Sequence, residues 1–419
     1  MYFLYSFLYG CVLVLSAPYF LYRSLREPGF GTSLLERFVG TRVNPRGERS
    51  IWIHAVSVGE VVAAGILVPH LREAFPGARI ALSVTTPTGR KVAEERLSGI
   101  DDLFYCPFDL SFILRKMIAR VRPSALVVIE TEIWPNLLRE ARITGALTLL
   151  VNGRISDRSF PRYLRIRFFL KRYLKEIDRF LMQSETYAKR IVEIGAAASS
   201  IRVVGSLKFD AAPDGAPPPS ARITPKGRRI LVAGSTLDPE ERIVFSVFER
   251  LRIATPDLFL VMAPRHVPRF EAVWELASSR GLRVARRSRG ESVEDADVLL
   301  LDTLGELASV YAEADYAFVG GSLASWGGHN IIEPASWGKP VLFGPHMQNF
   351  ADVARIFLDA EAAIQVRDEA ELESALRDLL ARPERCEELS RKAEAVVAEN
   401  RGAANRTVAA LKELLPCAF

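Results

Sequence analysis

Short apolar runs alternate with helix-like segments from residue 51 onward in this chain of 419 residues. Strands buried on both faces of a parallel sheet read as continuous hydrophobic stretches. The first half contains SIWIHAV, ARIALSVTT, SALVVIE, TLLVN and RFLMQS, with segments such as GEVVAAGILVPHLREAF between them. This alternation predicts an α/β fold built on parallel sheets.

The alternation is interrupted by Ala211–Gly227, which holds five prolines and two glycines. It restarts with RRILVAGST, DLFLVMAP, LRVARR, ADVLLLD, YAFVGGS and KPVLFGP. A chain of this length exceeds one ordinary domain, and a proline-rich segment suits a linker. We predict two α/β domains, 25–210 and 229–400, joined by a linker over 211–228, with a cleft between them. Ligands of such folds bind where strands end in loops.

The first residues form a separate apolar segment, because Met1–Tyr22 carries no charged side chain. As a helix with a rise of about 1.5 Å per residue it would cover roughly 33 Å, enough for a bilayer core. Arg23 and Arg26 follow the segment, which is unlike a cleaved signal and favours a cytoplasmic location for the rest of the chain. We expect residues 1–24 to be a membrane anchor. The other interpretation, a buried N-terminal helix, is favoured by the helix breaker Pro18.

The formal charge of +5 is unevenly distributed, because Arg154–Lys175 alone holds eight Arg or Lys residues among aromatic rings. Such a segment suits an anionic lipid surface. It also suits a solvated helix whose rings pack inward. Nucleic acid ranks third, because no RNP, KH or zinc-finger pattern accompanies the segment. We therefore expect anionic membrane lipids, and no nucleic acid, as partners.

Polar side chains follow the first predicted strand, in IWIHAVSVGEVVAA. His54, Ser57 and Glu60 converge there, and Glu60 stands at the start of a helix. A carboxylate in a first helical turn is stabilised by the helix dipole, so one interpretation is structural. The other is that Glu60 serves as a general base toward a hydroxyl.

Glu130 and Glu132 follow another apolar strand, in VVIETEIWPN. Residues two apart share a face if the strand continues through them. No Asp or His cluster stands nearby, and the four cysteines lack C-x-x-C spacing, so we predict contacts with an organic ligand and no metal site. Lys208 in GSLKFD is either solvated or placed to offset the charge of an anionic leaving group.

The second half has its own strand-end loops. In LVAGSTLDPEE, the turn Gly234–Thr236 precedes a helix expected to begin near Asp238, and backbone N–H groups at such turns bind anions. MAPRHVPRF places Arg265 after a strand, and DTLGELASVYAEAD places Gly305 beside Glu306. Neither a Walker A nor a G-x-G-x-x-G motif is present, so ATPases and dinucleotide dehydrogenases lack support.

The segment GGSLASWGGHNIIEPASWGKPVLFGP, Gly320–Pro345, combines two glycine pairs with one carboxylate. A helix is predicted from Asn330 to about Trp337. Its N-terminal amides suit a phosphate, and Glu333 suits the two hydroxyls of a ribose. The segment thus indicates a nucleotide-sugar site, with a structural glycine loop as the other interpretation.

Six motifs together resemble one family: HAVSVGE, ETEIWPN, NGRISDRS, AGSTLDPEE, APRHVPRF and GGSLASWGGHNIIEPASWGKPVLFGPHMQNF. They resemble the 3-deoxy-D-manno-octulosonic acid (Kdo) transferases of Gram-negative lipopolysaccharide synthesis, in order and spacing. NIIEP stands where some relatives have NPLE, which leaves Asn330 and Glu333 in place. The resemblance implies a GT-B glycosyltransferase fold with two Rossmann-like domains and a final helix over 401–419 that returns to the first. It also implies CMP-Kdo as donor, a tetraacylated lipid A precursor (lipid IVA) as acceptor, no cofactor, and a place on the cytoplasmic side of the inner membrane.

The resemblance assigns roles to individual residues. It makes Glu60 the general base, with transition-state support from Glu130 and Lys208. It assigns the CMP contacts to Pro264, Arg265, Gly305, Glu306, Leu307, Asn330, Ile331, Ile332 and Glu333. It implies an inverting transfer in which Glu60 takes the proton of an acceptor hydroxyl while CMP leaves. Two alternatives stay open: another nucleotide-sugar enzyme of this architecture acting at the membrane, and a non-catalytic lipid-binding protein.

Overall fold

A computed structural model describes residues 1–27, 29–39, 49–211 and 222–415. The chain divides into two compact units. Unit 1 comprises Met1–Ala211 and Arg401–Phe419, and unit 2 comprises Ala212–Asn400. Residues 212–221 of the expected linker, and 416–419 of the expected final helix, lie outside the described residues.

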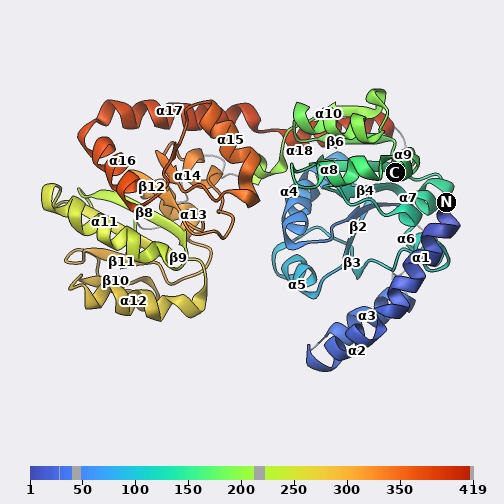
Figure 1. Ribbon diagram of the computed structural model, residues 1–419, viewed down its shortest axis with the longest axis horizontal. Coiled ribbons are helices and arrows are strands. Elements are labelled where there is room, and N and C mark those ends of the chain that lie inside the picture. Colours follow the sequence, from blue (N-terminus) through green and yellow to red (C-terminus); the bar gives the residue numbers. More distant parts are fainter. Residues whose placement is uncertain (28, 40–48, 212–221, 416–419) are drawn as a thin grey trace. The chain divides into compact units, whose positions relative to one another are not determined.

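Unit 1 is built on a parallel sheet of seven strands in the order β3-β2-β1-β4-β5-β6-β7 (Figure 1). The strands are β1 (Ser50–His54), β2 (Arg79–Val84), β3 (Asp102–Tyr105), β4 (Pro123–Ile129), β5 (Leu147–Gly153), β6 (Arg179–Met182) and β7 (Ile201–Val203). Every residue of β1, β2 and β4 is buried, which is why these strands are predominantly apolar in the sequence. The strand order reverses between β1 and β4, and in open α/β sheets ligands bind at such a point.

Helices cover both faces of this sheet. Helices α4, α5 and α18 share one apolar core with alternate strand residues such as Ile51 and Ile53. Helices α6, α7, α9 and α10 share the other core, with Trp52. The bounds are α4 (Val58–Ala74), α5 (Pro87–Arg96), α6 (Ser111–Val121), α7 (Pro135–Ile143), α8 (Phe160–Arg165), α9 (Arg167–Leu174), α10 (Glu185–Ile194), η1 (Ala198–Ser200), η2 (Leu207–Ala211) and α18 (Ala403–Leu414).

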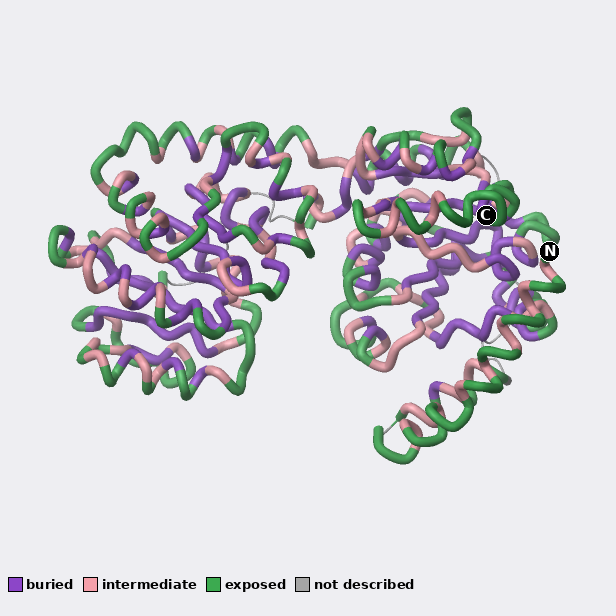
Figure 2. The backbone as a smooth tube through the Cα atoms, viewed as in Figure 1, coloured by how far each residue is buried: buried purple, intermediate pink, exposed green. Residues whose placement is uncertain are grey.

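Unit 2 repeats the plan with seven parallel strands in the order β10-β11-β9-β8-β12-β13-β14. The central strands of both sheets are buried (Figure 2), whereas the edge strands β7 and β14 have no buried residue. Its strands are β8 (Arg229–Thr236), β9 (Leu258–Pro264), β10 (Val284–Arg286), β11 (Val298–Leu300), β12 (Tyr316–Val319), β13 (Val341–Phe343) and β14 (Ile364–Gln365). Its α-helices are α11 (Glu240–Ala254), α12 (Phe270–Ser279), α13 (Leu307–Val310), α14 (Ile332–Ser336), α15 (Ala351–Asp359), α16 (Glu369–Ala381) and α17 (Pro383–Asn400). Its short 3-10 helices are η3 (Val267–Arg269), η4 (Arg287–Arg289), η5 (Tyr311–Glu313) and η6 (Gln348–Phe350). The predicted α/β class with two parallel, Rossmann-like sheets is confirmed.

The N-terminal segment forms two helices where one was expected over residues 1–24. Ser16 separates helix α1 (Tyr2–Leu15) from helix α2 (Ala17–Arg26), which has Pro18 in its first turn. Proline lacks the N–H that a continuing helix needs, which accounts for the break. Within the described part of the chain no single helix is long and apolar enough to cross a bilayer. Together α1 and α2 reach that length and composition, but they are bent by 48°.

One side of α1 packs on unit 1 and the other is exposed. The Tyr2 hydroxyl donates to Glu176 Oε1 at 2.6 Å, and Asn136 Nδ2 donates to Ser6 Oγ at 2.9 Å. Phe3 and Phe7, on the other side, are 85% and 60% exposed. The fold therefore leaves the apolar side of α1 that carries Phe3 and Phe7 exposed. Helix α3 (Phe30–Val39) follows α2 and packs against it.

The basic segment 154–175 contains α8 and α9. Leu170 and Tyr173 point into the core, whereas Phe168 is 78% exposed. The ring of Tyr173 lies 5.3 Å from that of Tyr2 on α1. Some rings of this segment thus pack inward and others face solvent.

Candidate functional site

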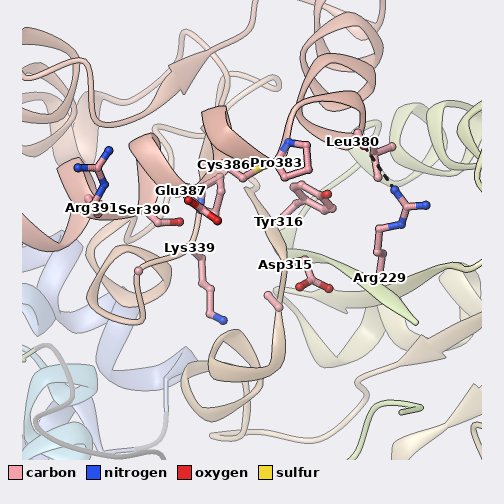
Figure 3. A pocket seen from close by; sticks show the side chains of 13 residues that line it. Arg229, Asp315, Tyr316, Lys339, Leu380, Pro383, Cys386, Glu387, Ser390 and Arg391 are labelled. Atoms are coloured by element: carbon pink, nitrogen blue, oxygen red, sulfur yellow. Dashed lines mark hydrogen bonds between the residues drawn. The ribbon is translucent and has the colours of Figure 1, made fainter. Parts of the chain in front are cut away.

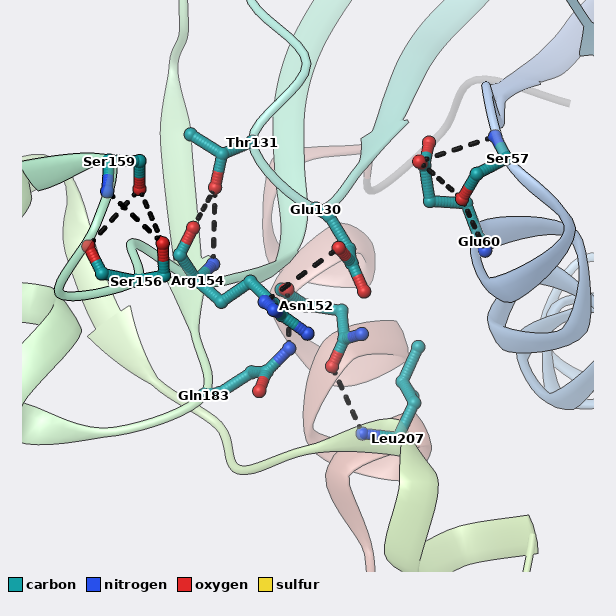
Figure 4. Close-up of polar contacts among 10 residues, drawn as sticks. All are labelled: Ser57, Glu60, Glu130, Thr131, Asn152, Arg154, Ser156, Ser159, Gln183 and Leu207. Atoms are coloured by element: carbon teal, nitrogen blue, oxygen red, sulfur yellow. Dashed lines mark hydrogen bonds and ion pairs between the residues drawn. The ribbon is translucent and has the colours of Figure 1, made fainter. Parts of the chain in front are cut away.

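The carboxyl ends of β1, β4 and β5 bring the polar residues of unit 1 to one edge of its sheet. Figure 4 shows Ser57 and Glu60 at the start of α4, with Glu130 after β4 and Asn152 at the end of β5. This edge includes the point between β1 and β4 where the strand order reverses. The fold therefore assembles these residues where ligands of α/β sheets bind.

Glu60 is held by the start of its own helix. Its Oε2 accepts from the backbone N–H of Val56 at 2.6 Å, and its Oε1 accepts from Ser57 Oγ at 2.8 Å. Ser57 Oγ in turn accepts from the Glu60 N–H at 3.4 Å, which completes a capping box. The structural interpretation of Glu60, a helix-start acid, thus holds.

The same carboxyl group is electrostatically prepared for proton transfer. Burial raises the pKa of Glu60 to about 7, against the hydrogen bonds from Val56 and Ser57, and the charges of Glu132 and Glu130 raise it further. Only 5% of Glu60 is exposed. A carboxylate whose pKa lies near neutrality is a more effective general base than an ordinary one, because it is partly ionised and still binds a proton well.

The backbone of Glu130 corrects one expectation from the sequence. Strand β4 ends at Ile129, and Glu130 has a left-handed φ of 60°. Glu130 and Glu132 therefore do not share a strand face. Glu130 Oε2 lies 4.0 Å from Arg154 Nε, and Glu132 accepts from Trp134 Nε1 at 3.0 Å. A left-handed conformation is unfavourable for a residue with a side chain, and such residues concentrate at functional sites.

Asn152 is a second left-handed residue at this edge, with a φ of 56°. Its Oδ1 accepts from the Leu207 N–H at 3.1 Å, which fixes the segment that carries Lys208 beside the end of β5 (Figure 4). Its buried Nδ2 finds no hydrogen-bond partner among the described residues. The motif NGRISDRS marked this junction, but nothing in the sequence pointed to the side chain of Asn152 as the link to Lys208.

His54 belongs to the core of unit 1 rather than to its open edge. The residue is fully buried, its Nδ1 lies 2.9 Å from Ser83 Oγ, and its ring meets that of Trp134 at 5.0 Å. Burial, and secondarily the charge of Arg37, lowers the pKa of His54 to about 3. His54 is therefore neutral at physiological pH, and its role is to pack against Ser83 and Trp134 beneath the carboxyl edge of the sheet.

In unit 2 the expected CMP contacts also follow strand ends. Pro264 ends β9, and the Arg265 N–H donates to the Thr236 carbonyl at the end of β8 at 3.0 Å. Gly305, with a φ of 89°, leads into α13 after β11, and Asn330 precedes α14 after β12. The strand order places β11, β9, β8 and β12 side by side, so these loops line one edge.

Glu333 lies in the first turn of α14, which begins at Ile332 rather than at Asn330 as expected. Its Oε1 accepts from Asn330 Nδ2 at 3.2 Å, and Asn330 Oδ1 accepts from the Ile332 N–H at 3.1 Å. Burial raises the pKa of Glu333, while the bond from Asn330 and the charge of Arg265 act in the opposite direction. Arg265 and Glu333 thus lie close enough to interact.

The other expected contacts of unit 2 differ in how much of each residue a ligand can reach. Ile331 and Ile332 are fully buried, so their side chains belong to the core and only their backbone is available to a ligand. The Glu306 carboxylate already accepts from Arg287 Nη2 at 2.7 Å and from the Thr303 hydroxyl. Leu307 begins α13 and is half-buried.

A pocket of about 540 Å³ lies at the opposite edge of the unit 2 sheet (Figure 3). Arg229, Tyr316 and Pro340, which line it, stand at or just before the first residues of β8, β12 and β13. The pocket is therefore at the amino ends of the strands, away from the expected CMP contacts. Among the described residues, no group of three or more His, Cys, Asp or Glu side chains is arranged to hold a metal ion.

Comparison with known proteins gives matches over almost the whole chain. A family model described as 3-deoxy-D-manno-octulosonic-acid transferase (kdotransferase) matches residues 32–211. The 3-deoxy-D-manno-octulosonic acid transferase of Bordetella pertussis is 37% identical, covering 91% of this chain and 92% of its own. The protein of the same name from Haemophilus influenzae is 33% identical, covering 98% of this chain and 99% of its own.

The fold has wider relatives among solved structures. The UDP-GlcNAc 2-epimerase of Neisseria meningitidis superposes with a TM-score of 0.59 at 11% identity, covering 87% of this chain and 100% of its own. At this identity the likeness concerns the fold alone. It supports a GT-B-like pairing of two Rossmann-like sheets.

Proposed function

The chain belongs to the 3-deoxy-D-manno-octulosonic acid (Kdo) transferase family, and on this premise we propose that it moves Kdo from CMP-Kdo to a hydroxyl of a lipid A precursor. The observation that carries the chemistry is the Glu60 carboxyl, which is buried at the switch point of unit 1 and has a pKa of about 7. A transfer to a sugar hydroxyl needs a base of this kind, because the hydroxyl has to lose its proton as its oxygen attacks.

We assign the proton-accepting step to Glu60. The carboxylate takes the proton from the acceptor hydroxyl while the hydroxyl oxygen forms a bond to the anomeric carbon of Kdo. The bond from that carbon to the CMP phosphate oxygen breaks, its electron pair leaves with CMP, and the configuration inverts. The fold of unit 1 holds Glu130 and Lys208 near the ends of β4 and β5. We assign both to the stabilisation of the transition state, in which charge develops as CMP leaves.

The donor is assigned to the loops at the carboxyl edge of the unit 2 sheet. Glu333, half-buried in the first turn of α14, accepts hydrogen bonds from the two ribose hydroxyls. We assign the single phosphate of CMP to Arg265 and to the backbone amides of Asn330, Ile331 and Glu333, because a guanidinium and N–H groups both favour an anion. The Ile332 N–H is left out because it donates to Asn330 Oδ1. Pro264 and Gly305–Leu307 complete the contact surface.

We further propose that α1 and α2 attach the protein to the inner membrane, with both units on the cytoplasmic side. The exposed apolar side of α1, with Phe3 and Phe7, is available to lipid, and the arginines of α8 and α9 suit anionic headgroups. Such attachment keeps the protein beside an acylated acceptor.

The proposal is tested by incubating the purified full-length protein with CMP-Kdo and the lipid A precursor, followed by mass spectrometry of the lipid. The lipid mass is expected to increase by one or more Kdo residues. Reactions with UDP-N-acetylglucosamine in place of CMP-Kdo serve as the control and should leave the lipid unchanged. An unmodified lipid with CMP-Kdo, or transfer from the UDP-sugar, contradicts the proposal.

A further inference from the structure

The loop that follows β12 is wrapped around the side chain of Glu240. The Glu240 carboxylate accepts five backbone N–H groups, four of them from residues 321–324 of this loop. Oε2 accepts from Gly321 at 2.6 Å and Leu237 at 3.1 Å, and Oε1 accepts from Ser322 at 2.8 Å, Leu323 at 2.8 Å and Ala324 at 3.2 Å. The residue has no exposed surface. Consecutive amides that converge on one point form an anion site, and here the anion is part of the chain.

The place of this carboxylate in the fold matters for phosphate binding. Glu240 begins α11, the helix after β8, and the strand order of unit 2 reverses between β8 and β12. In Rossmann-like folds the start of that helix commonly receives a ligand phosphate. In this chain five amides at the switch point already donate to Glu240. The sequence predicted that the turn Gly234–Thr236 binds an anion. In the structure the carboxylate of Glu240 lies beside this turn and takes the place of a ligand anion.

The loop has little freedom to rearrange around another anion. A Cβ at Gly320 would lie 2.6 Å from Thr236 Cα and 2.9 Å from Glu240 Oε2. Ser322 Oγ accepts from the Gly344 N–H at 2.8 Å, which ties the loop to the residue after β13. The geometry around the Glu240 carboxylate is thus fixed by packing among the carboxyl ends of β8, β12 and β13.

The same loop supports the segment that leads to the expected ribose contact. The Gly321 carbonyl accepts from the Gly328 N–H at 2.7 Å, and the Gly320 carbonyl lies 2.8 Å from His329 Nδ1. His329 directly precedes Asn330. Burial is the main cause of the lowered pKa of His329, and the charges of Arg265 and Glu240 act on it in opposite directions. Glu240 therefore lies near the residues assigned to the nucleotide.

We propose that Glu240 determines which nucleotides unit 2 accepts: its carboxylate fills the amide site at the switch point and excludes a second phosphate group there. The proposal rests on the assignment of CMP binding to unit 2. A nucleoside monophosphate places its one phosphate at Arg265 and α14 and avoids Glu240. A nucleoside diphosphate has to bring further negative charge toward a buried carboxylate, and like charges placed together repel each other.

The test compares the full-length protein with Glu240→Ala, which opens the amide site, and Glu240→Gln, which removes the charge and keeps the volume. Glu241→Gln is the matched control, because Glu241 is also buried in the first turn of α11 but bonds to Arg269 at 3.2 Å instead of to the loop. Two quantities are measured for each protein: the dissociation constants of CMP and CDP, and the unfolding temperature with and without inorganic phosphate or formate.

The parent and Glu241→Gln are expected to bind CDP at least about tenfold more weakly than CMP and to show no stabilisation by formate beyond a general salt effect. Glu240→Ala should bind CDP about as well as CMP and gain unfolding temperature with formate or phosphate. Glu240→Gln should lose the discrimination between CMP and CDP, because its side chain carries no negative charge. It should not respond to formate, because its side chain still fills the site.

The outcomes separate the inference from the assignment on which it rests. A parent protein that binds neither CMP nor CDP contradicts the nucleotide assignment itself. A parent that prefers CMP, with the same preference retained in Glu240→Gln, overturns the role of Glu240. If Glu240→Ala is recovered only in an unfolded state, the test relies on the ratio of the CDP and CMP dissociation constants of Glu240→Gln. A ratio equal to that of Glu241→Gln refutes the proposal.

Discussion

At the scale of single residues, Glu60 combines two opposed demands. As the third residue of α4, in the capping box with Ser57, it accepts hydrogen bonds that favour its charged form, whereas its burial favours the neutral form. Burial dominates, and the pKa of about 7 is the balance of the two effects. The donors around the carboxyl therefore set the pH range in which it works as a base.

Ser57→Ala should move the pH–rate profile toward higher pH. The parent rate is expected to rise through a pH of about 7, because only ionised Glu60 accepts a proton. The substitution removes the hydroxyl that donates to Glu60 Oε1, so the charged form loses support and the midpoint rises by roughly 1. The measurement is the initial rate of transfer between about pH 5 and pH 9 at saturating donor.

Thr86→Ala is the matched control, because Thr86 caps α5 through the Gly89 N–H at 3.1 Å and no Glu60 atom is involved. It should cost similar stability and leave the midpoint unchanged. If the midpoint of the pH–rate profile shifted equally in both variants, the shift would reflect the loss of folding stability and not the loss of the Ser57–Glu60 hydrogen bond.

At the scale of elements, the C-terminal helix α18 is joined to unit 1 by a distant side chain. Gly402 precedes the helix and offers no side-chain cap of its own. Asp210 in η2 supplies the cap, accepting from the Gly402 N–H and the Ala404 N–H, each at 2.6 Å. A negative charge at a helix start is also favoured by the helix dipole.

Asp210→Ala should lower the free energy of unfolding by about 1–2 kcal/mol, because two amides at the start of α18 lose their acceptor. Asp210→Asn retains one side-chain oxygen, so its free energy of unfolding should lie between those of the parent and Asp210→Ala. The quantity to measure is the midpoint of denaturant unfolding for all three proteins. Equal midpoints for the parent and the alanine variant would mean that water replaces Asp210 at no cost.

The exposed side of α1 supports a second prediction at this scale. The double substitution Phe3→Ser and Phe7→Ser should weaken binding to vesicles of mixed anionic and zwitterionic lipid by about tenfold or more, because each buried Phe contributes about 1.5–3 kcal/mol. Sedimentation with the vesicles measures the bound fraction. Ile253→Ser is the control, since Ile253 is 83% exposed in unit 2 and should not contact lipid. An unchanged bound fraction in the double variant would refute the assignment of this side of α1 to the membrane.

At the scale of the whole molecule, the two kinds of residue that the proposed reaction needs belong to different units. Glu60 is in unit 1, and Glu333 and Arg265 are in unit 2. Because each unit has its own sheet and core, a substitution in one should leave the local structure of the other intact. Proton transfer and nucleotide affinity should therefore be separable by mutation.

Glu60→Gln should reduce kcat by about a hundredfold or more while the Kd of CMP stays at the parent value. Glu333→Gln should raise the Kd of CMP by about tenfold, because the ribose hydroxyls lose a charged acceptor. Calorimetric titration gives Kd, and steady-state transfer rates give kcat. A Glu60→Gln protein that retains parent turnover would remove Glu60 from the proton-transfer step.

The sequence by itself determined the parts of this protein that depend on local pattern. The apolar runs identified the buried strands of both sheets, because a strand buried on both faces leaves no polar alternation. The edge strands β3, β7 and β14 were not predicted, because they are short and partly exposed and so leave no long apolar run. The motifs also located the strand-end loops that carry Glu60, Glu130 and Glu333. Local pattern does not show whether a strand continues for one more residue, which is why the left-handed turn at Glu130 was not expected.

Only the tertiary structure decided how distant segments complete one another. Glu240 meets amides 81 to 84 residues away, and Asp210 meets amides 192 and 194 residues away. Their partners are backbone N–H groups, which every residue except proline carries, so no residue type in the sequence marks them. Such contacts become visible only once packing has brought the loops together, and the same packing sets the burial that raises the pKa of Glu60.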